Sequence, residues 1–119
     1  MKIYLFCSGG FSTSLLANKM SEAYKDKGRS DVTVEAMDFG SLDSVIEEAD
    51  VIVLAPQIAW AKEQVEEDYP GKKVYLLTIQ EFGSMDGNMI VEKIEKRGVD
   101  NERKKRRKKF FIEIYRSGK

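Results

Sequence analysis

The sequence predicts a single α/β domain: a four-stranded parallel sheet with helices on both faces, in the order βαβαβαβα, with a phosphate loop after the first strand. The main reason is that segments with strand and helix patterns alternate strictly along residues 2–98. In addition, residues 51–54 are apolar at every position, as expected for a strand in the middle of a parallel sheet. A length of 119 residues suits one domain with one core.

The strands are short apolar runs, and the helices carry apolar residues at helical spacing. We expect strands at residues 2–6, 32–37, 51–54 and 74–78. We expect helices at residues 12–27, 58–68 and 84–97, and a short one that is capped by Ser41 or Asp43 and runs to Ala49. Loops are expected at residues 55–57 and 79–83, and helix ends at Gly28, Pro70-Gly71 and Gly98.

The most informative residue is Cys7, the only cysteine, which follows the first strand. After it comes a small, hydroxyl-rich loop that leads into a helix: Ser8, Gly9, Gly10, Phe11, Ser12, Thr13 and Ser14. Glycines allow backbone N–H groups to turn inward, and the first N–H groups of a helix have no partner within it. Such a site binds anions and favours a nucleophilic thiolate. The alternative is a small buried hydrophobic residue, although an inert core cysteine does not need a polar loop after it.

Composition narrows the possible functions. The chain has no histidine, which excludes a Ser-His-Asp triad, a Cys-His pair and most zinc sites. We therefore expect no metal site, and no motif indicates a cofactor. We expect no membrane span, because the longest apolar stretch is Val51 to Ala55. We expect no signal peptide, because the first predicted strand already begins at residue 2. A lone cysteine fits a reducing cytosol.

The net charge of zero hides two segments of opposite sign. Residues 1–100 contain 11 lysines and arginines against 18 aspartates and glutamates, whereas residues 101–119 contain 9 against 2. We therefore expect a domain at residues 1–100 and a basic C-terminal extension at residues 101–119. The extension could attract nucleic acid or anionic lipid, but a solvated tail without a specific partner is the favoured interpretation.

Several chemistries at Cys7 can be excluded by spacing. A low-molecular-weight tyrosine phosphatase has an arginine six residues after its cysteine, where this chain has Thr13. Thioredoxin-type redox chemistry requires a second cysteine, and a nucleotide P-loop requires a lysine that the segment Gly10-Phe11-Ser12 lacks. A site remains that can accept a phosphoryl group on sulfur and pass it on.

Three segments carry a family resemblance: Ile3 to Leu16, Ala55-Pro56-Gln57-Ile58, and Phe82 to Gly87. Together they closely resemble the enzyme IIB component of the bacterial phosphoenolpyruvate-dependent sugar phosphotransferase system, lactose/cellobiose family, over about residues 1–98. The resemblance implies that Cys7 is the catalytic, phosphorylated nucleophile and that residues 8–14 bind the phosphate. It also implies a cytoplasmic carrier that takes phosphate from a IIA phosphohistidine. The carrier would pass this phosphate to a sugar of the cellobiose, lactose or β-glucoside class, held by the IIC membrane permease.

The chain also departs from the family pattern. The basic tail is not a family feature, Phe82 replaces a common tyrosine, and the segment that follows Gln57 lacks the arginine or tyrosine of many relatives. We expect the partner-binding surface to be the rim around Cys7, and its tentative members are Phe11, Pro56, Gln57 and Ile58. Ile58 could instead start the next helix and pack inward. The alternative function is a non-catalytic regulatory or interaction domain with a tail that binds nucleic acid.

Overall fold

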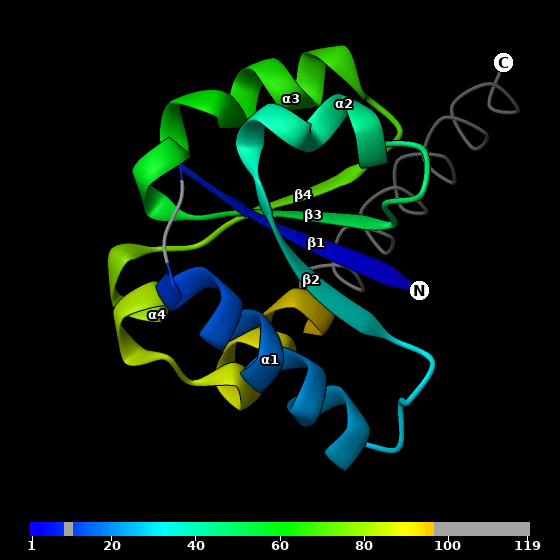
Figure 1. The fold of residues 1–119 in the computed structure, drawn as a ribbon, viewed down its shortest axis with the longest axis vertical. Coiled ribbons are helices and arrows are strands. Elements are labelled where there is room, and N and C mark those ends of the chain that lie inside the picture. Colours follow the sequence, from blue (N-terminus) through cyan, green and yellow to red (C-terminus); the bar gives the residue numbers. More distant parts are fainter. Residues whose placement is uncertain (9–10, 97–119) are drawn as a thin grey trace, which may run out of the picture.

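The computed structural model describes residues 1–8 and 11–96 and contains a parallel sheet in the order β2-β1-β3-β4 (Figure 1). The strands are β1 (Lys2–Cys7), β2 (Thr33–Asp38), β3 (Val51–Leu54) and β4 (Lys73–Leu76). The α-helices are α1 (Phe11–Asp26), α2 (Leu42–Val45), α3 (Lys62–Asp68) and α4 (Ile79–Ser84), and residues 87–96 are also helical. Two 3₁₀ helices are η1 (Phe39–Ser41) and η2 (Pro56–Ala61). The expected helix end at Gly98 and the basic extension lie outside the described residues.

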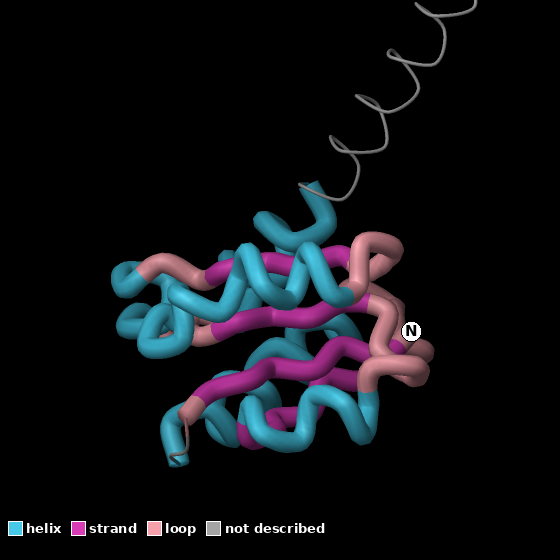
Figure 2. The backbone as a smooth tube through the Cα atoms, turned by 90° about the horizontal axis from the view of Figure 1, so that it is seen from above, coloured by secondary structure: helices cyan, strands magenta, loops and turns pink. Residues whose placement is uncertain are grey.

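The sheet has a hydrophobic core on each face, which confirms the predicted architecture. Successive side chains of a strand point to opposite faces. Accordingly, Ile3 and Leu5 of β1 pack with α1 and the helix at residues 87–96, whereas Tyr4 and Phe6 pack with α2, η2 and α3. Figure 2 shows the strands between two layers of helix. β1 therefore contributes side chains to both cores, and alternate positions along this strand face different helices.

The prediction of a loop at residues 79–83 is wrong, because these residues belong to α4. Thr78 and Glu81 form a capping box: the Thr78 hydroxyl accepts from the Glu81 N–H at 3.0 Å, and the Glu81 carboxylate accepts from the Thr78 N–H at 2.9 Å. This cap also explains why β4 ends before Thr78. The helix expected at residues 84–97 begins later, because Met85 closes α4 in the left-handed region with φ 52°.

Other predicted boundaries differ for local reasons. The loop expected at residues 55–57 is mostly the start of η2, which joins α3 across the non-helical backbone of Ile58. The short helix predicted to reach Ala49 ends at Val45, and Ser41 precedes it without a side-chain capping bond. Gly28 follows the end of α1 and has a positive φ of 78°, which agrees with the helix end predicted at this glycine.

Gly87 fixes the last described helix against α1. A Cβ atom at this residue would lie 2.5 Å from the backbone carbon and oxygen of Lys19. Only glycine therefore allows this approach, and the helix that follows α4 is held directly on the element that carries Thr13. The turn after α4 thus supports the face of the sheet on which α1 lies.

Candidate functional site

Cys7 lies where the order of the strands reverses. β1 pairs in parallel with β2 on one side and with β3 on the other, although β3 does not follow β1 directly in the chain. The Ala55 N–H donates to the Phe6 carbonyl at 2.9 Å, which brings the start of η2 next to the end of β1. The Pro56-Gln57 segment, a predicted part of the rim around Cys7, thus follows a strand that pairs directly with β1. Ligands of open parallel sheets bind at such a switch point, beyond the carboxyl ends of the strands.

The alternation along β1 directs the Cys7 side chain toward α1. Cys7 is 6 % exposed, and the Thr13 hydroxyl, from the first turn of α1, donates to its Sγ at 2.8 Å. Thr13 is itself buried, with 3 % of its surface exposed. The thiol is therefore held between the end of a strand and the start of a helix. The cysteine is buried, as the alternative interpretation expects, but its sulfur also accepts a hydrogen bond from α1.

Cys7 has an acidic neighbour in the sheet that the sequence alone does not place there. Asp38 is the register partner of Cys7 across β1 and β2, and its side chain is exposed. One of its carboxylate oxygens approaches Gly40, since a Cβ atom at that glycine would lie 3.1 Å from it. Only the pairing of the strands reveals this neighbour, because 31 positions separate the two residues in the sequence.

The edge around Cys7 exposes large apolar side chains. Among the described residues, four large hydrophobic side chains are exposed, and only Met1 lies at the opposite edge of the sheet. The other three, which we call the apolar rim, are Leu15 (52 % exposed), Trp60 (72 %) and Ile79 (80 %). They come from the start of α1, from η2 and from the start of α4, which all lie at the carboxyl ends of the strands (Figure 1).

Ile58 is not an exposed anchor of this edge. It is 2 % exposed and belongs to the core under α2 and α3, so the alternative in which it packs inward is correct. The exposed apolar residue of this segment is Trp60, which stacks edge-on against Phe39 with ring centroids 5.7 Å apart. Phe39 in turn packs edge-on against Phe6, the residue before Cys7, with ring centroids 6.4 Å apart. The sequence marks this segment only by the missing arginine or tyrosine of many relatives, which does not single out Trp60.

The other predicted site residues have different surroundings. Gln57 is exposed and Pro56 is half-buried, while Ser8 and Ser14 are exposed on either side of the loop. Gly9 and Gly10, and the side chains of Phe11 and Ser12, lie outside the described residues. The structure thus brings together Cys7, Thr13 and the Pro56-Gln57 segment, with the exposed hydroxyls of Ser8 and Ser14 at the ends of the loop.

Glu81 anchors α4 at the same edge of the sheet. Its side chain is 5 % exposed and accepts a hydrogen bond from the Tyr75 hydroxyl at 2.8 Å, and the Lys93 ammonium lies 3.4 Å from its carboxylate. Burial is the largest influence and by itself raises the pKa of this carboxyl. The hydrogen bonds from Thr78 and Tyr75 and the charge of Lys93 together outweigh it, so that the pKa lies below its ordinary value. The residue is a structural support of α4.

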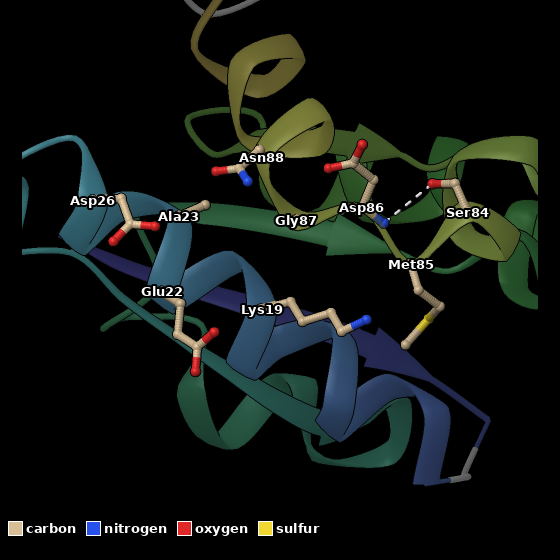
Figure 3. A pocket seen from close by; sticks show the side chains of 9 residues that line it. All are labelled: Lys19, Glu22, Ala23, Asp26, Ser84, Met85, Asp86, Gly87 and Asn88. Atoms are coloured by element: carbon tan, nitrogen blue, oxygen red, sulfur yellow. Dashed lines mark hydrogen bonds between the residues drawn. The ribbon is translucent and has the colours of Figure 1, made fainter.

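A pocket of about 380 Å³ lies elsewhere, between the later turns of α1 and the start of the last described helix (Figure 3). Charged side chains of both signs line it, among them Lys19, Glu22 and Asp86. Its lining does not include Cys7 or Thr13. Within the described residues, no group of acidic, histidine or cysteine side chains could hold a metal ion, and no helix has the length and apolar character needed to cross a membrane.

Known proteins are similar to this chain in sequence. The chain is 31 % identical to the cellobiose-specific EIIB component of the PTS system of Lactococcus lactis subsp. lactis, over 78 % of this chain and 92 % of that protein. It is 30 % identical to the galactose-specific EIIB component of Lactococcus lactis subsp. cremoris, with the same coverage. It is also 30 % identical to the oligo-beta-mannoside-specific EIIB component of Bacillus subtilis, over 76 % and 89 %.

Solved structures agree with these relatives. The lactose-specific IIB component domain from Streptococcus pneumoniae superimposes with a TM-score of 0.73 over 81 % of this chain and 95 % of that one, at 18 % identity, and so shows the fold. The cellobiose-specific phosphotransferase IIB component protein from Borrelia burgdorferi gives a TM-score of 0.63 at 31 % identity, over 77 % and 85 %. The sequence model of the lactose/cellobiose-specific IIB subunits of the PTS system matches residues 2–93. The chain therefore belongs to the lactose/cellobiose-specific IIB family of the phosphoenolpyruvate:carbohydrate phosphotransferase system.

Proposed function

We propose that this IIB protein carries a phosphoryl group on Cys7. The observation that carries the proposal is the place of this thiol: the chain's single cysteine lies at the topological switch point, at the start of the loop that enters α1. Backbone N–H groups at such a helix start stabilise anions, so the loop suits the phosphoryl oxygens once they are attached to sulfur. Residues 8–14 are the proposed phosphate-binding loop.

The proposed reaction has two steps. The Cys7 thiolate attacks the phosphorus of a phosphohistidine on the IIA protein: the S–P bond forms, the P–N bond breaks, and its electron pair remains on the imidazole. A sugar hydroxyl then attacks the same phosphorus: the O–P bond forms, the hydroxyl proton passes to solvent, the S–P bond breaks, and its electron pair returns to sulfur. The sugar is held by the IIC permease, and the carrier works in the cytoplasm, in peripheral contact with this membrane partner.

The surroundings of the thiol support storage of the phosphoryl group. The position where a tyrosine phosphatase has its arginine is occupied here by Thr13, which is buried against the sulfur. Without a guanidinium to bind the equatorial oxygens, the transition state of hydrolysis receives less stabilisation. We expect the phosphocysteine to lose its phosphoryl group to water slowly and to a sugar hydroxyl quickly.

The apolar rim is the proposed docking surface for the partner proteins. A phosphoryl donor has to approach in line with the sulfur, so its contacts have to surround Cys7. Exposed Trp60, with Gln57 beside it in η2, replaces Ile58 as the proposed anchor, and Phe11 and Pro56 remain proposed members. Interface cores are rich in aromatic side chains such as Trp60 and poor in charge.

The sugar is proposed to be of the cellobiose, lactose or β-glucoside class. Relatives of nearly equal identity to this chain are named for cellobiose, galactose and oligo-beta-mannoside. A carrier that presents only a phosphoryl group has no need to contact the ring of the sugar. This supports a division of labour in which the permease selects the substrate.

Intact-mass measurement tests the function directly. The protein is incubated with phosphoenolpyruvate, the general phosphotransfer proteins and a IIA protein of this family, and we expect the mass of one phosphoryl group to be added. Cys7→Ser should remain folded and unmodified, because the change is small. A serine variant that still relays phosphate to sugar would overturn the proposal. Binding of nucleic acid that weakens with salt and survives Cys7→Ser, without phosphorylation of the native protein, would instead favour the regulatory alternative.

A further inference from the structure

Thr13 is one of two polar residues that are buried within the described part of the chain. The other, Glu81, has a structural explanation in its capping box and its bond from Tyr75. A buried hydroxyl costs free energy unless it has a hydrogen-bond partner. The partner of the Thr13 hydroxyl is the Cys7 sulfur at 2.8 Å, so this polar group is buried toward the reacting atom.

The hydroxyl comes from a rigid part of the scaffold. Thr13 is the third residue of α1, a helix of 16 residues, and a β-branched side chain in a helix has few rotamers. The next residues on the same face of the helix, Leu16 and Ala17, are in the core, which fixes the rotation of α1 about its axis. Gly87 in turn holds α1 against the following helix. The donor is therefore preorganised before any partner binds.

We propose that Thr13 is a positioning residue that holds the Cys7 sulfur and stabilises its negative charge by donating a hydrogen bond to it. This deepens the proposed phosphocysteine function and rests on it. The sequence assigned Thr13 to the phosphate, whereas its contact assigns it to the sulfur. A hydroxyl donates more strongly to a thiolate than to a neutral thiol, because a charged acceptor strengthens the bond. The thiolate is also the form that attacks phosphorus.

Alkylation of Cys7 by iodoacetamide at a fixed neutral pH tests this without any partner. Cys7 is the only cysteine, so each labelled molecule reports on this thiol. Loss of a hydrogen bond to a charged group predicts that Thr13→Val reacts about 10- to 100-fold more slowly than the native protein. Thr13→Ser keeps the hydroxyl and should react within about threefold of it. Thr33→Val, at an exposed position of β2, is the matched control and should not differ.

Two results would overturn the inference: a folded Thr13→Val protein that reacts as fast as the native one, or a Thr13→Ser protein as slow as Thr13→Val. If the valine variant does not fold by circular dichroism, the pair Thr13→Ser and Thr13→Ala makes the same comparison, since these two differ only in the hydroxyl. The serine variant then has to react about tenfold faster than the alanine variant, and equal rates would contradict the role of the hydroxyl.

Phosphorylation by the IIA protein separates this inference from the proposed function. We expect Thr13→Val to lower the maximal rate of phosphoryl acceptance about tenfold or more, with the KM for the IIA protein little changed, since Thr13 is buried below the surface. A change confined to KM would contradict positioning. If the native protein accepts no phosphate but its alkylation depends on the Thr13 hydroxyl, the proposed function fails and the contact to sulfur stands.

Discussion

The two ends of the sheet differ in how their surface residues are used: polar groups pair at the amino ends of the strands, which we call the amino edge, and apolar groups are exposed at the carboxyl ends, the carboxyl edge. At the amino edge, the chain bonds to itself: the terminal ammonium donates to the Asp31 carbonyl at 2.9 Å, and the Lys2 N–H donates to Asp50 at 2.7 Å. The Glu48 carboxylate there accepts from Lys2 and from Tyr4. At the carboxyl edge, where β1 ends at Cys7, the large side chains of the apolar rim are exposed. The described polar groups at the amino edge pair within the chain, whereas the carboxyl edge exposes large apolar side chains of the kind that partners cover.

The largest expected effect is a loss of stability where the last described helix packs against α1. Gly87→Ala places a methyl group against the backbone of Lys19, which cannot move aside as a side chain can. We expect the free energy of unfolding to fall by about 3 kcal/mol, the upper part of the range for overpacked sites. Urea denaturation measures it. Gly83→Ala, where a Cβ atom has no neighbour within 4 Å, is the matched control. Equal stability of the two variants would show that α1 and the last helix approach less closely than described.

The comparison of the edges is sharpened by Trp60→Ala. The indole is largely exposed, so its removal should change the thermal midpoint little. A central aromatic residue of an interface contributes more than about 1 kcal/mol to binding, which predicts transfer from the IIA protein to be about tenfold less efficient. Initial rates at low IIA concentration measure this, with Lys2→Ala at the amino edge as the control. If both variants transfer at the native rate, the apolar rim is not the docking surface.

A smaller effect is expected from Glu81→Gln. The amide keeps an acceptor for Thr78 but loses the charge that faces Tyr75 and Lys93, so we expect a loss of about 1 kcal/mol at neutral pH. The pKa of the Glu81 carboxyl is lowered in the folded state, so its contribution is present above the ordinary pKa of a glutamate. It is lost as the pH falls through the folded value. Thermal midpoints of the two proteins should therefore converge on acidification, and a constant difference would contradict this.

The smallest effect is expected at the amino edge. Glu48→Gln removes the ion pair with Lys2, whose ammonium lies 3.3 Å from the carboxylate. Both side chains are more than half exposed, at 54 % and 59 %, so solvent and salt already screen the pair. We expect the thermal midpoint and the transfer rate to stay within experimental error of the native values. A clear loss of transfer would show that this edge also meets a partner.

Periodicity and turn chemistry allowed most of the fold to be predicted. The run Val51–Leu54 and the apolar stripe of α1 each had one consistent interpretation, and both elements occur where the pattern placed them. The missed helix α4 had a local signal as well, since Thr78 and Glu81 have the spacing of a capping box. The 3₁₀ geometry of η2 left no comparable signal, because the same residues also suit a loop followed by an α-helix.

The site was predictable in its chemistry and less so in its contacts. Cys7 could be singled out because few chemical functions fit a single cysteine that precedes a glycine-containing loop and a helix. The contact of Thr13 with sulfur depends on the rotation of α1, which packing against the sheet decides, and so it could not be read from the chain. The proximity of Asp38 depends on strand order. The sequence left Ile58 open between the surface and the core, and the turn of η2 directs it, and not Trp60, toward the core.

The position of Trp60 has a spectroscopic consequence. It is the only tryptophan in the chain, and its indole lies in the solvent-exposed rim while stacking edge-on against Phe39. Selective excitation therefore observes one chromophore, and this chromophore lies at the edge that a partner is expected to cover. Transfer of the ring from water into an interface shifts its emission to shorter wavelength. The native protein thus carries its own fluorescent label for titration with IIA, and no dye has to be attached to the thiol under study.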